Sequence, residues 1–453
     1  MALTSAASTL PIHSQALVTK MPKSLKLHLL VLLMALIASP ALAANWYVRP
    51  SGGTGSGSSW TAAWNGLGAI QWGSVACGDT IWVAGGSYSQ SLSLTKTGCA
   101  STSRVYIRKA RADAAECTGA AGWSSAYDST VHQTRSSINV SNANYMVVSG
   151  RTSASGGANG WWIDFTGATS GTGIEWPNDA TGSNNTLEYI DIQGPGNITY
   201  SSDGRGIDAT PFSSASGNLF SHLKIWNWES GIYNAGINNS TFEYIDEFDI
   251  MAVNWSSFHP NGIYISGSAN GVVRYSKFHK GPGGNGTGEG IFVEQSGNAN
   301  GWQIYGNVFY DLTSTLKAIE ITAPVSGWKI YNNTFVNITI PPGEYSANCS
   351  SSEYRNNFFY ATSVGSCGTA SNNVTAGGTD RFVNYGAKDF HIVSTTGSGY
   401  ARNAGVNLSS LFTLDMDGDS FGSDGTWDVG AYAYGGAVGT QPNPPAGLTA
   451  VVQ

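Results

Sequence analysis

Short runs of alternating apolar and polar residues recur along most of the chain. Each run opens with Gly-Ile or Ala-Ile and continues as an extended segment typical of a β-strand. A second apolar run follows each start and ends on a bulky residue, as in "NNTLEYIDI" and "YNNTFVNI", with Asn and Gly at the bends. The starts fall at Gly173, Gly206, Gly231, Gly262, Gly290 and Ala318, at intervals of 33, 25, 31, 28 and 28 residues.

A repeat of this length predicts a stacked array of coils, each built from two or three short strands. Each coil leaves its strand edges unpaired, and the next coil satisfies them about 4.8 Å away. We therefore predict an all-β solenoid in which Ile and Phe of successive coils stack into one continuous core. Earlier strands at "RVYIRKA", "YMVVSG" and "GWWIDF" extend the array towards the N-terminus.

The Gly-Ile strands and Asn-x-Phe turns resemble the coils of the right-handed parallel β-helix of the pectin-lyase superfold. "NWYVRPSGGTGSG…CGDTIWVAGGSYSQ" is similar to the capping start of such exported proteins, and "WDVGAYAY" at 427–434 is similar to their terminal strand. The resemblance covers residues 45 to 434 and implies a right-handed parallel β-helix with an N-terminal cap. It matches no specific family, and a fold of this kind hosts many chemistries.

Three segments are predicted along the chain. Residues 1–43 combine an extended start with a secretory signal peptide: Lys23 and Lys26, then the apolar run 29–38, then the small-residue site Ala41–Ala43. Residues 44–434 form the β-helix domain. Residues 435–453, "QPNPPAGLTAVVQ" included, are predicted as a linker and the truncated start of a fibronectin-like module. We expect export to the extracellular space or periplasm.

Charge narrows the range of partners. The formal charge of the whole chain is −7, and removing residues 1–43 takes away three lysines and no acid, which moves it to −10. An acidic chain without basic runs argues against nucleic acid and anionic membranes as partners. No later apolar segment is long enough to span a bilayer. We expect a monomer that acts on a polysaccharide without inserting into a membrane.

The five cysteines are spaced as neighbours on adjacent coils would be. Cys349 and Cys367 are 18 residues apart, and Cys77 and Cys99 are 22 apart. Residues one coil apart lie near the Cα separation that a disulfide needs. We predict Cys349–Cys367 first and Cys77–Cys99 second, with Cys99–Cys117 as the rival of the latter.

The residue after each Gly-Ile is expected to point outwards, because side chains alternate along a strand. This position holds Glu175, Asp208, Tyr233, Tyr264, Phe292 and Glu320 on consecutive coils. An exposed row of rings between acids predicts a sugar-binding track. The alternative is ordinary cross-strand aromatic pairing, or cover by a neighbouring loop. Substrate binding is assigned to six residues: Tyr233, Tyr264, Phe292, Trp255, Asp208 and Arg205.

Two carboxyl groups on this face suit glycoside hydrolysis. Glu294 and Glu320 lie on adjacent predicted coils, offset by two strand positions. Strand geometry separates their Cα atoms by about 8 Å, which favours an inverting mechanism.

β-Elimination of a uronate polysaccharide is the leading hypothesis, and it needs a base and a group that neutralises the uronate carboxylate. Lys317, His279 and His259 are the candidate bases, and Arg205 is a candidate neutraliser. Glu289 is the equivalent of Lys317 one coil earlier, so an ion pair between them is the alternative for Lys317. Glycoside hydrolysis and non-catalytic glycan binding or adhesion remain alternatives to the lyase. The full set of catalytic candidates is Glu289, Glu294, Glu320, Lys317, His279 and His259.

A calcium ion is the one cofactor that the sequence suggests. "DMDGDS" alternates Asp415, Asp417 and Asp419 around a glycine, which is similar to a calcium loop. A polar turn near the C-terminal cap is the alternative.

Overall fold

The computed structural model describes residues 43–177, 181–196, 204–209, 215–250, 260–281, 288–294, 299–312, 317–339, 349–364 and 368–435. The chain divides into two compact units, Met1–Ala43 and Ala44–Gln453, and the description below concerns the second. The predicted signal peptide and the predicted C-terminal linker lie almost entirely outside the described residues. No helix among the described residues has the length and apolarity that crossing a membrane requires.

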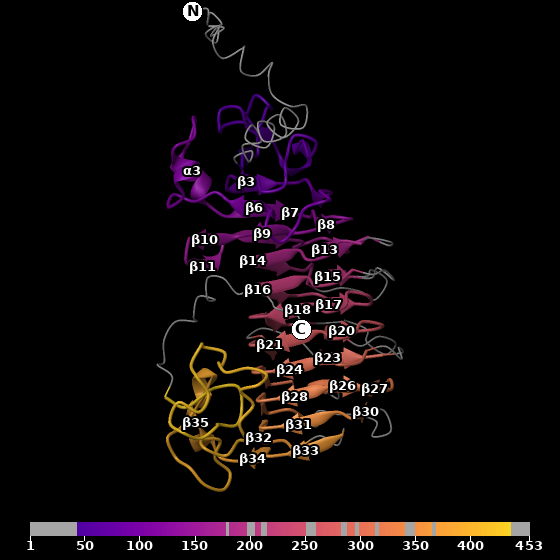
Figure 1. Cartoon of the computed structure of the whole chain (residues 1–453), viewed down its shortest axis with the longest axis vertical. Helices are drawn as coiled ribbons and strands as arrows, with labels where there is room; N and C mark the ends of the chain where they lie inside the picture. Colours follow the sequence, from indigo (N-terminus) through magenta and orange to yellow (C-terminus); the bar gives the residue numbers. More distant parts are fainter. Residues whose placement is uncertain are drawn as a thin grey trace, which may run out of the picture. The chain divides into compact units, whose positions relative to one another are not determined.

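Sheet B is a stack of eight parallel strands, one per coil, and it contains every predicted Gly-Ile start. Residues that follow the glycines pair in register from coil to coil, for example Ile207 with Ile232 and Ile263 with Ile291. In Figure 1 the labels from β8 to β26 follow one another in sequence order. The strands are β5 (Leu92–Leu94), β8 (Ile138–Val140), β13 (Gly171–Trp176), β15 (Gly204–Ala209), β17 (Ser230–Asn234), β20 (Asn261–Ile265), β23 (Glu289–Val293) and β26 (Ile319–Ile321).

Sheet A has 22 strands in two columns that meet at a bend. The first column stacks β1 (Asn45–Arg49), β3 (Thr80–Val83), β6 (Val105–Lys109), β9 (Met146–Ser149), β18 (Thr241–Glu243), β21 (Val272–Arg274), β24 (Gln303–Tyr305), β28 (Lys329–Tyr331), β31 (Glu353–Arg355) and β33 (Thr369–Ser371). The second column stacks β4 (Gly86–Tyr88), β7 (Val131–Thr134), β12 (Trp161–Asp164), β19 (Asp246–Phe248), β22 (Lys277–His279), β25 (Val308–Tyr310), β29 (Thr334–Val336), β32 (Phe358–Tyr360) and β34 (Val374–Ala376). Two longer strands, β14 (Thr186–Gln193) and β16 (Leu219–Trp226), run through both columns. β2 (Trp64–Asn65) pairs with β1.

Each coil therefore passes through sheet B, then through the two columns of sheet A. Parallel strands joined in this way are wound right-handed, because that crossover is the one a right-twisted strand favours. The chain is a right-handed parallel β-helix, as predicted. The remaining strand pairs are β10 (Arg151–Ser153) with β11 (Gly156–Asn159), β27 (Val325–Ser326) with β30 (Cys349–Ser350), and β35 (Phe382–Asn384) with β36 (Asp389–Ile392).

Identical side chains stack inside the coils. Ile174, Ile207, Ile232, Ile263, Ile291 and Ile319 are all fully buried in sheet B. On the second column, Phe278, Phe309, Phe335 and Phe359 form a ladder with ring centroids 4.9, 5.0 and 5.0 Å apart. One residue in this row breaks the apolar pattern: Glu247 pairs with Ile225 on one side and with Phe278 on the other.

A ladder of buried asparagines holds the bend between the two columns of sheet A. Asn333 Nδ2 donates to Ile304 O at 2.8 Å and to Asn357 Oδ1 at 3.0 Å. The backbone N–H of Asn307 donates to Asn333 Oδ1 at 3.0 Å, and the same pattern continues to Asn373. Buried backbone groups at a bend must find partners, and these amides supply them.

The two ends of the described chain pack onto the coils. Trp60, Tyr47, Trp82 and buried Cys117 form a separate apolar cluster beside the first strands, together with the short helix α3 (Ala115–Thr118). This cluster matches the predicted N-terminal cap. Residues 382–434 pack against sheet A, where Phe412 stacks on Tyr305 with centroids 4.5 Å apart. Figure 1 shows this region in yellow beside the orange strands.

One of the two predicted disulfides is confirmed. Cys77 and Cys99 are bonded, with Cα atoms 5.3 Å apart. The rival pairing of Cys99 with Cys117 is wrong, because Cys117 carries a free thiol. Cys349 is also disulfide-bonded, and its predicted partner, Cys367, lies outside the described residues.

Candidate functional site

The outer face of sheet B carries the predicted row of acids and rings. Strand register pairs Glu175 with Asp208, Asp208 with Tyr233, and Tyr233 with Tyr264. Phe292 and Glu320 continue the row on the next two coils. The sequence therefore placed these residues correctly on neighbouring coils.

The expected exposure of the rings is wrong. Tyr264 is 9% exposed and Phe292 is 4% exposed, so neither presents much apolar surface to water. Tyr233 and Tyr264 also stack on each other, with centroids 4.3 Å apart and planes 10° apart. The guanidinium of Arg205 lies 3.8 Å from the centroid of the Tyr233 ring. Faces stacked in this way are not free for sugars, so cross-strand pairing describes the rings better than a stacking track.

Two carboxyl groups face each other at the N-terminal end of this row. Glu175 and Asp208 are direct partners on β13 and β15, which places their Cα atoms about 4.8 Å apart. Arg205 Nη1 lies 2.8 Å from Asp208 Oδ2 and compensates its charge. Burial, followed by the negative charge of Asp208, raises the pKa of Glu175 above its ordinary value. The two groups thus differ in electrostatic environment.

Asn139 precedes Glu175 in the same row, because β8 pairs with β13. Its Oδ1 is buried and has no hydrogen-bond partner among the described residues. A buried acceptor without a donor costs free energy.

A second group of polar side chains lies further along the same face. Tyr264 donates its hydroxyl hydrogen to Glu294 Oε2 at 3.2 Å. Burial is the first cause that raises the pKa of Tyr264, so its hydroxyl remains a donor through neutral pH. Lys317 Nζ lies 3.4 Å from Glu320 Oε1. Glu294 and Glu320 sit diagonally on adjacent strands, since Phe292 is the direct partner of Glu320, and this is the offset that the sequence predicted.

The other catalytic candidates are distributed differently. Glu289 begins β23 of sheet B opposite Asn261 and is 2% exposed. His279 belongs to β22 of sheet A, and it shares the lining of a small cavity with the sheet B candidate Glu289. Its Nε2 lies 3.1 Å from Asp246 Oδ1, and its Nδ1 lies 2.9 Å from Lys280 O. Trp255 and His259 lie outside the described residues.

The "DMDGDS" segment forms a polar turn. Asp415 Oδ1 accepts hydrogen bonds from the N–H groups of Asp417 and Asp419 at 2.9 and 2.8 Å, and its Oδ2 accepts from Ala433 N. Asp417 Oδ2 lies 2.6 Å from His391 Nε2. Oxygens engaged in this way do not fit a calcium loop. Within the described residues, no group of three or more His, Cys, Asp or Glu side chains is arranged to hold a metal ion.

Comparison with known proteins finds similar structures but no similar sequences. No protein-family model and no curated protein matches the sequence. The structure is similar to pectate lyase Pel9A, at 14% identity and a TM-score of 0.47, over 86% of this chain and 96% of that one. A rhamnogalacturonan lyase gives 12% identity and a TM-score of 0.42, over 76% and 92%. The GH136 lacto-N-biosidase from Eubacterium ramulus gives 9% and 0.39, over 73% and 67%. Similarity at these values concerns the architecture alone.

Sequence reasoning overlooked Glu175 as a catalytic candidate. It identified the outward row, but it compared Glu294 with Glu320 rather than Glu175 with Asp208. The signal was available: two acids at the same position after consecutive Gly-Ile starts, in "GIEW" and "GIDA", with Arg205 three residues before one of them. An arginine beside one acid of a pair is what separates their environments.

Proposed function

We propose that the protein hydrolyses a glycan at the outer face of sheet B, with Glu175 and Asp208 as the reacting carboxyl groups. The observation that supports this most is their direct pairing on adjacent strands, one beside Arg205 and the other with a raised pKa. Glycoside hydrolysis needs one protonated and one ionised carboxyl group. Retaining enzymes hold their two carboxyl groups about 5 Å apart, a distance that side chains on neighbouring strands about 4.8 Å apart can reach.

In the proposed reaction, the carboxylate of Asp208 attacks the anomeric carbon while Glu175 donates its proton to the departing glycosidic oxygen. The bond between that carbon and the oxygen breaks, and a glycosyl ester forms on Asp208. Glu175, now ionised, then takes a proton from water, whose oxygen displaces Asp208 from the anomeric carbon. Arg205 holds Asp208 in position and compensates its negative charge before and after the reaction.

The charges on this face favour a neutral glycan. Its described cations, Arg205 and Lys317, are each within an ion pair, at 2.8 and 3.4 Å. The same face carries several acids: Glu175, Asp208, Glu294 and Glu320. A polyanionic chain would meet like charges there, which costs binding free energy.

β-Elimination is the second candidate, and Lys317 is the observation that favours it. An amine on the same face as Arg205 supplies the base that removal of a uronate C5 proton needs. Its ion pair with Glu320 holds the amine away from a substrate and works against that role. Glu294 and Glu320 remain a second carboxyl pair for hydrolysis, at the diagonal spacing that suits inversion.

The test is incubation of the protein with a panel of neutral and uronate polysaccharides, followed by reducing-end and ultraviolet assays. We expect new reducing ends without unsaturated products, and nuclear magnetic resonance should show the first product with retained anomeric configuration. Glu175→Gln and Asp208→Asn should each lower kcat by 100-fold or more, because one reacting group is lost. Activity should fall as pH rises through the pKa of Glu175, since the ionised form cannot donate a proton.

Glu188→Gln is the matched control, because Glu188 pairs with Arg151 at 2.9 Å on sheet A, as Asp208 pairs with Arg205 on sheet B. Its activity should equal that of the original protein. Unsaturated products would instead support the lyase, and retention of glycan without cleavage would support a binding protein. Full activity in both Glu175→Gln and Asp208→Asn would remove this pair from the mechanism.

A further inference from the structure

Glu247 is a carboxylic acid inside the β-helix. It occupies the inward row of the second column of sheet A, where its neighbours are Ile225 and Phe278. The side chain is 1% exposed, and neither Oε1 nor Oε2 has a hydrogen-bond partner in the part of the chain that the structure describes. An ionised carboxylate without a partner in such a place would cost several kcal/mol.

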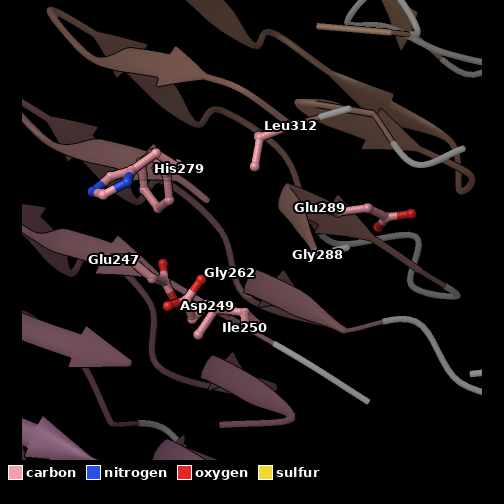
Figure 2. A pocket seen from close by; sticks show the side chains of 9 residues that line it. Glu247, Asp249, Ile250, Gly262, His279, Gly288, Glu289 and Leu312 are labelled. Carbon is pink, nitrogen blue, oxygen red and sulfur yellow. The ribbon is translucent and has the colours of Figure 1, made fainter. Parts of the chain in front are cut away.

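The carboxyl group reaches across the interior to sheet B. A Cβ atom placed on Gly231 would lie 1.4 Å from Glu247 Oε1, and one placed on Gly262 would lie 3.0 Å from Glu247 Oε2. The missing side chains of these two glycines are therefore the space that Glu247 occupies. Figure 2 shows Glu247 beside Gly262 and Asp249. The two glycines belong to β17 (Ser230–Asn234) and β20 (Asn261–Ile265). The same strands carry Tyr233 and Tyr264 on the outer face of sheet B.

A small cavity adjoins the carboxyl group. Its lining includes Glu247, Asp249, Phe278, His279, Glu289 and Leu312. Both ring nitrogens of His279 are engaged elsewhere, with Asp246 Oδ1 and Lys280 O. The space is about 20 Å³ for the centre of a water molecule, which is room for about one ordered water.

The charged and titratable groups around Glu247 offer it no compensating cation among the described residues. On its own strand and the following residues lie Asp246 and Asp249, and β23 contributes Glu289. Asp249 Oδ1 accepts a hydrogen bond from Gly281 N. Lys224, Lys277 and His279, on the neighbouring strands β16 and β22, occupy outward positions that alternate with the buried Ile225 and Phe278. Burial, followed by the charge of Asp246, raises the pKa of Glu247 well above its ordinary value.

We propose that Glu247 is a proton-controlled latch: its neutral carboxyl group packs between β19 and the glycines of β17 and β20, and its ionisation loosens these coils. When the proton leaves, the charge must draw water into the cavity or push the strands apart. The loosened strands are those that carry the outer face of sheet B. The consequence for catalysis rests on the proposed function, whereas the consequence for stability does not.

The sign of the effect follows from the raised pKa. Below about pH 4, the carboxyl group is protonated in both the folded and the unfolded chain, and folding carries no penalty. Above that pH the unfolded chain releases the proton and the folded chain keeps it. The equilibrium constant for folding then falls by up to tenfold per pH unit, until the folded-state pKa is passed.

The experiment compares unfolding of the full chain and its Glu247→Gln variant in guanidinium chloride at pH values from 5 to 9. Glutamine keeps the size of the side chain and has no proton to lose. We expect the equilibrium constant for folding to fall less steeply with pH in Glu247→Gln than in the original protein. The two slopes should differ by up to a factor of ten per pH unit. Glu116→Gln, an exposed change in α3, is the control and should keep the original slope.

Two results would overturn the latch. One is an unchanged slope in Glu247→Gln, which would mean that the carboxyl group is not protonated in the folded chain. The other concerns the infrared spectrum of the original protein minus that of Glu247→Met, taken at pH 7. This difference should contain the carbonyl band of a protonated carboxylic acid, and its absence would exclude the latch even if glutamine impairs folding. Neither measurement depends on activity, so a failure of the proposed hydrolysis would leave both interpretable.

Discussion

At the scale of single residues, close contacts with neighbouring atoms explain why the first residue of each Gly-Ile pair is glycine. A Cβ atom on Gly206 would meet Gly231 O at 2.6 Å, and one on Gly290 would meet a ring carbon of Phe309 at 2.7 Å. The glycine brings the backbone of sheet B close to the interior side chains of sheet A. The Gly-Ile repeat therefore indicates close packing across the interior as well as the position of the strands.

Gly231→Ala tests this packing. The added methyl group would overlap the carboxyl group of Glu247, so we expect a loss of about 2 kcal/mol in the free energy of unfolding. Chemical denaturation measures it. Gly377→Ala is the control, since no heavy atom lies within 4 Å of its added Cβ atom.

A double-mutant cycle with Glu247→Ala identifies the cause of that loss. Truncating Glu247 removes the overlap, so the methyl group at Gly231 should cost at least 1 kcal/mol less in that background. An additive cycle would show that the contact with Glu247 is not responsible.

The candidate site shows how far residue-level prediction reached. Alternation after the Gly-Ile starts was enough to place Asp208, Tyr233 and Glu320 in one outward row. It could not give the exposure of Tyr264 and Phe292, because that depends on the chain that covers them. Nor could it predict that Tyr233 and Tyr264 stack face to face, which is decided by side-chain torsions.

At the scale of elements, the asparagine ladder replaces apolar packing at the sheet A bend. Asn307, Asn333 and Asn357 are fully buried, and each amide bonds to the coils on both sides. The "NN" pairs were read in the sequence as turn residues, which is correct for the first asparagine of the pair. Asn332 has a φ of 47°, whereas Asn333 is the ladder residue. Composition alone does not separate these two roles.

Asn333→Ala should lower the free energy of unfolding by about 3 kcal/mol. The change removes hydrogen bonds to Ile304 O and Asn357 and leaves Asn307 N without its acceptor, and each unsatisfied buried group costs about 1–3 kcal/mol. Thermal and chemical unfolding measure the loss. Asn407→Ala, which removes one exposed bond to Ser409 N, should cost less than about 1 kcal/mol. Equal losses at the two sites would refute a special role for the ladder.

At the scale of the whole molecule, the C-terminal residues pack along the coils. Asn332 Nδ2 donates to the backbone oxygens of Asp428 and Gly430 at 3.0 Å each. Asn356 Nδ2 donates to Val406 O at 2.8 Å. The sequence suggested a terminal strand at 427–434, whereas the structure has a turn-rich segment there, held by side chains of the coils. Repeat periodicity gave the coils, but an irregular segment has no period to read.

His391 stabilises the packing of the C-terminal residues in a pH-dependent way. It lies between Asp389 and Asp417; burial opposes its charge, but hydrogen bonds to both carboxylates raise its pKa to about 8. The stabilisation that charged His391 contributes is fully present below about pH 6.5 and is lost as pH rises through about 8. After allowance for solvent screening, we expect about 1 kcal/mol.

His391→Gln measures this contribution. Its free energy of unfolding should be lower than that of the original protein at pH 6, and the difference should shrink towards zero by pH 9. Chemical denaturation at constant ionic strength gives both curves. A difference that stays constant with pH would mean that His391 contributes by packing on Tyr432 rather than by charge.

The in-register stacking of coils also bears on how such a chain can change over generations. Every coil offers its successor the same backbone edge and the same inner isoleucine, so a duplicated or deleted coil meets neighbours that already fit it. Side chains that touch two or three coils at once, as Glu247 does with Gly231 and Gly262, are the exception. The number of coils can thus change by whole coils during evolution, except where such a residue contacts several coils at once.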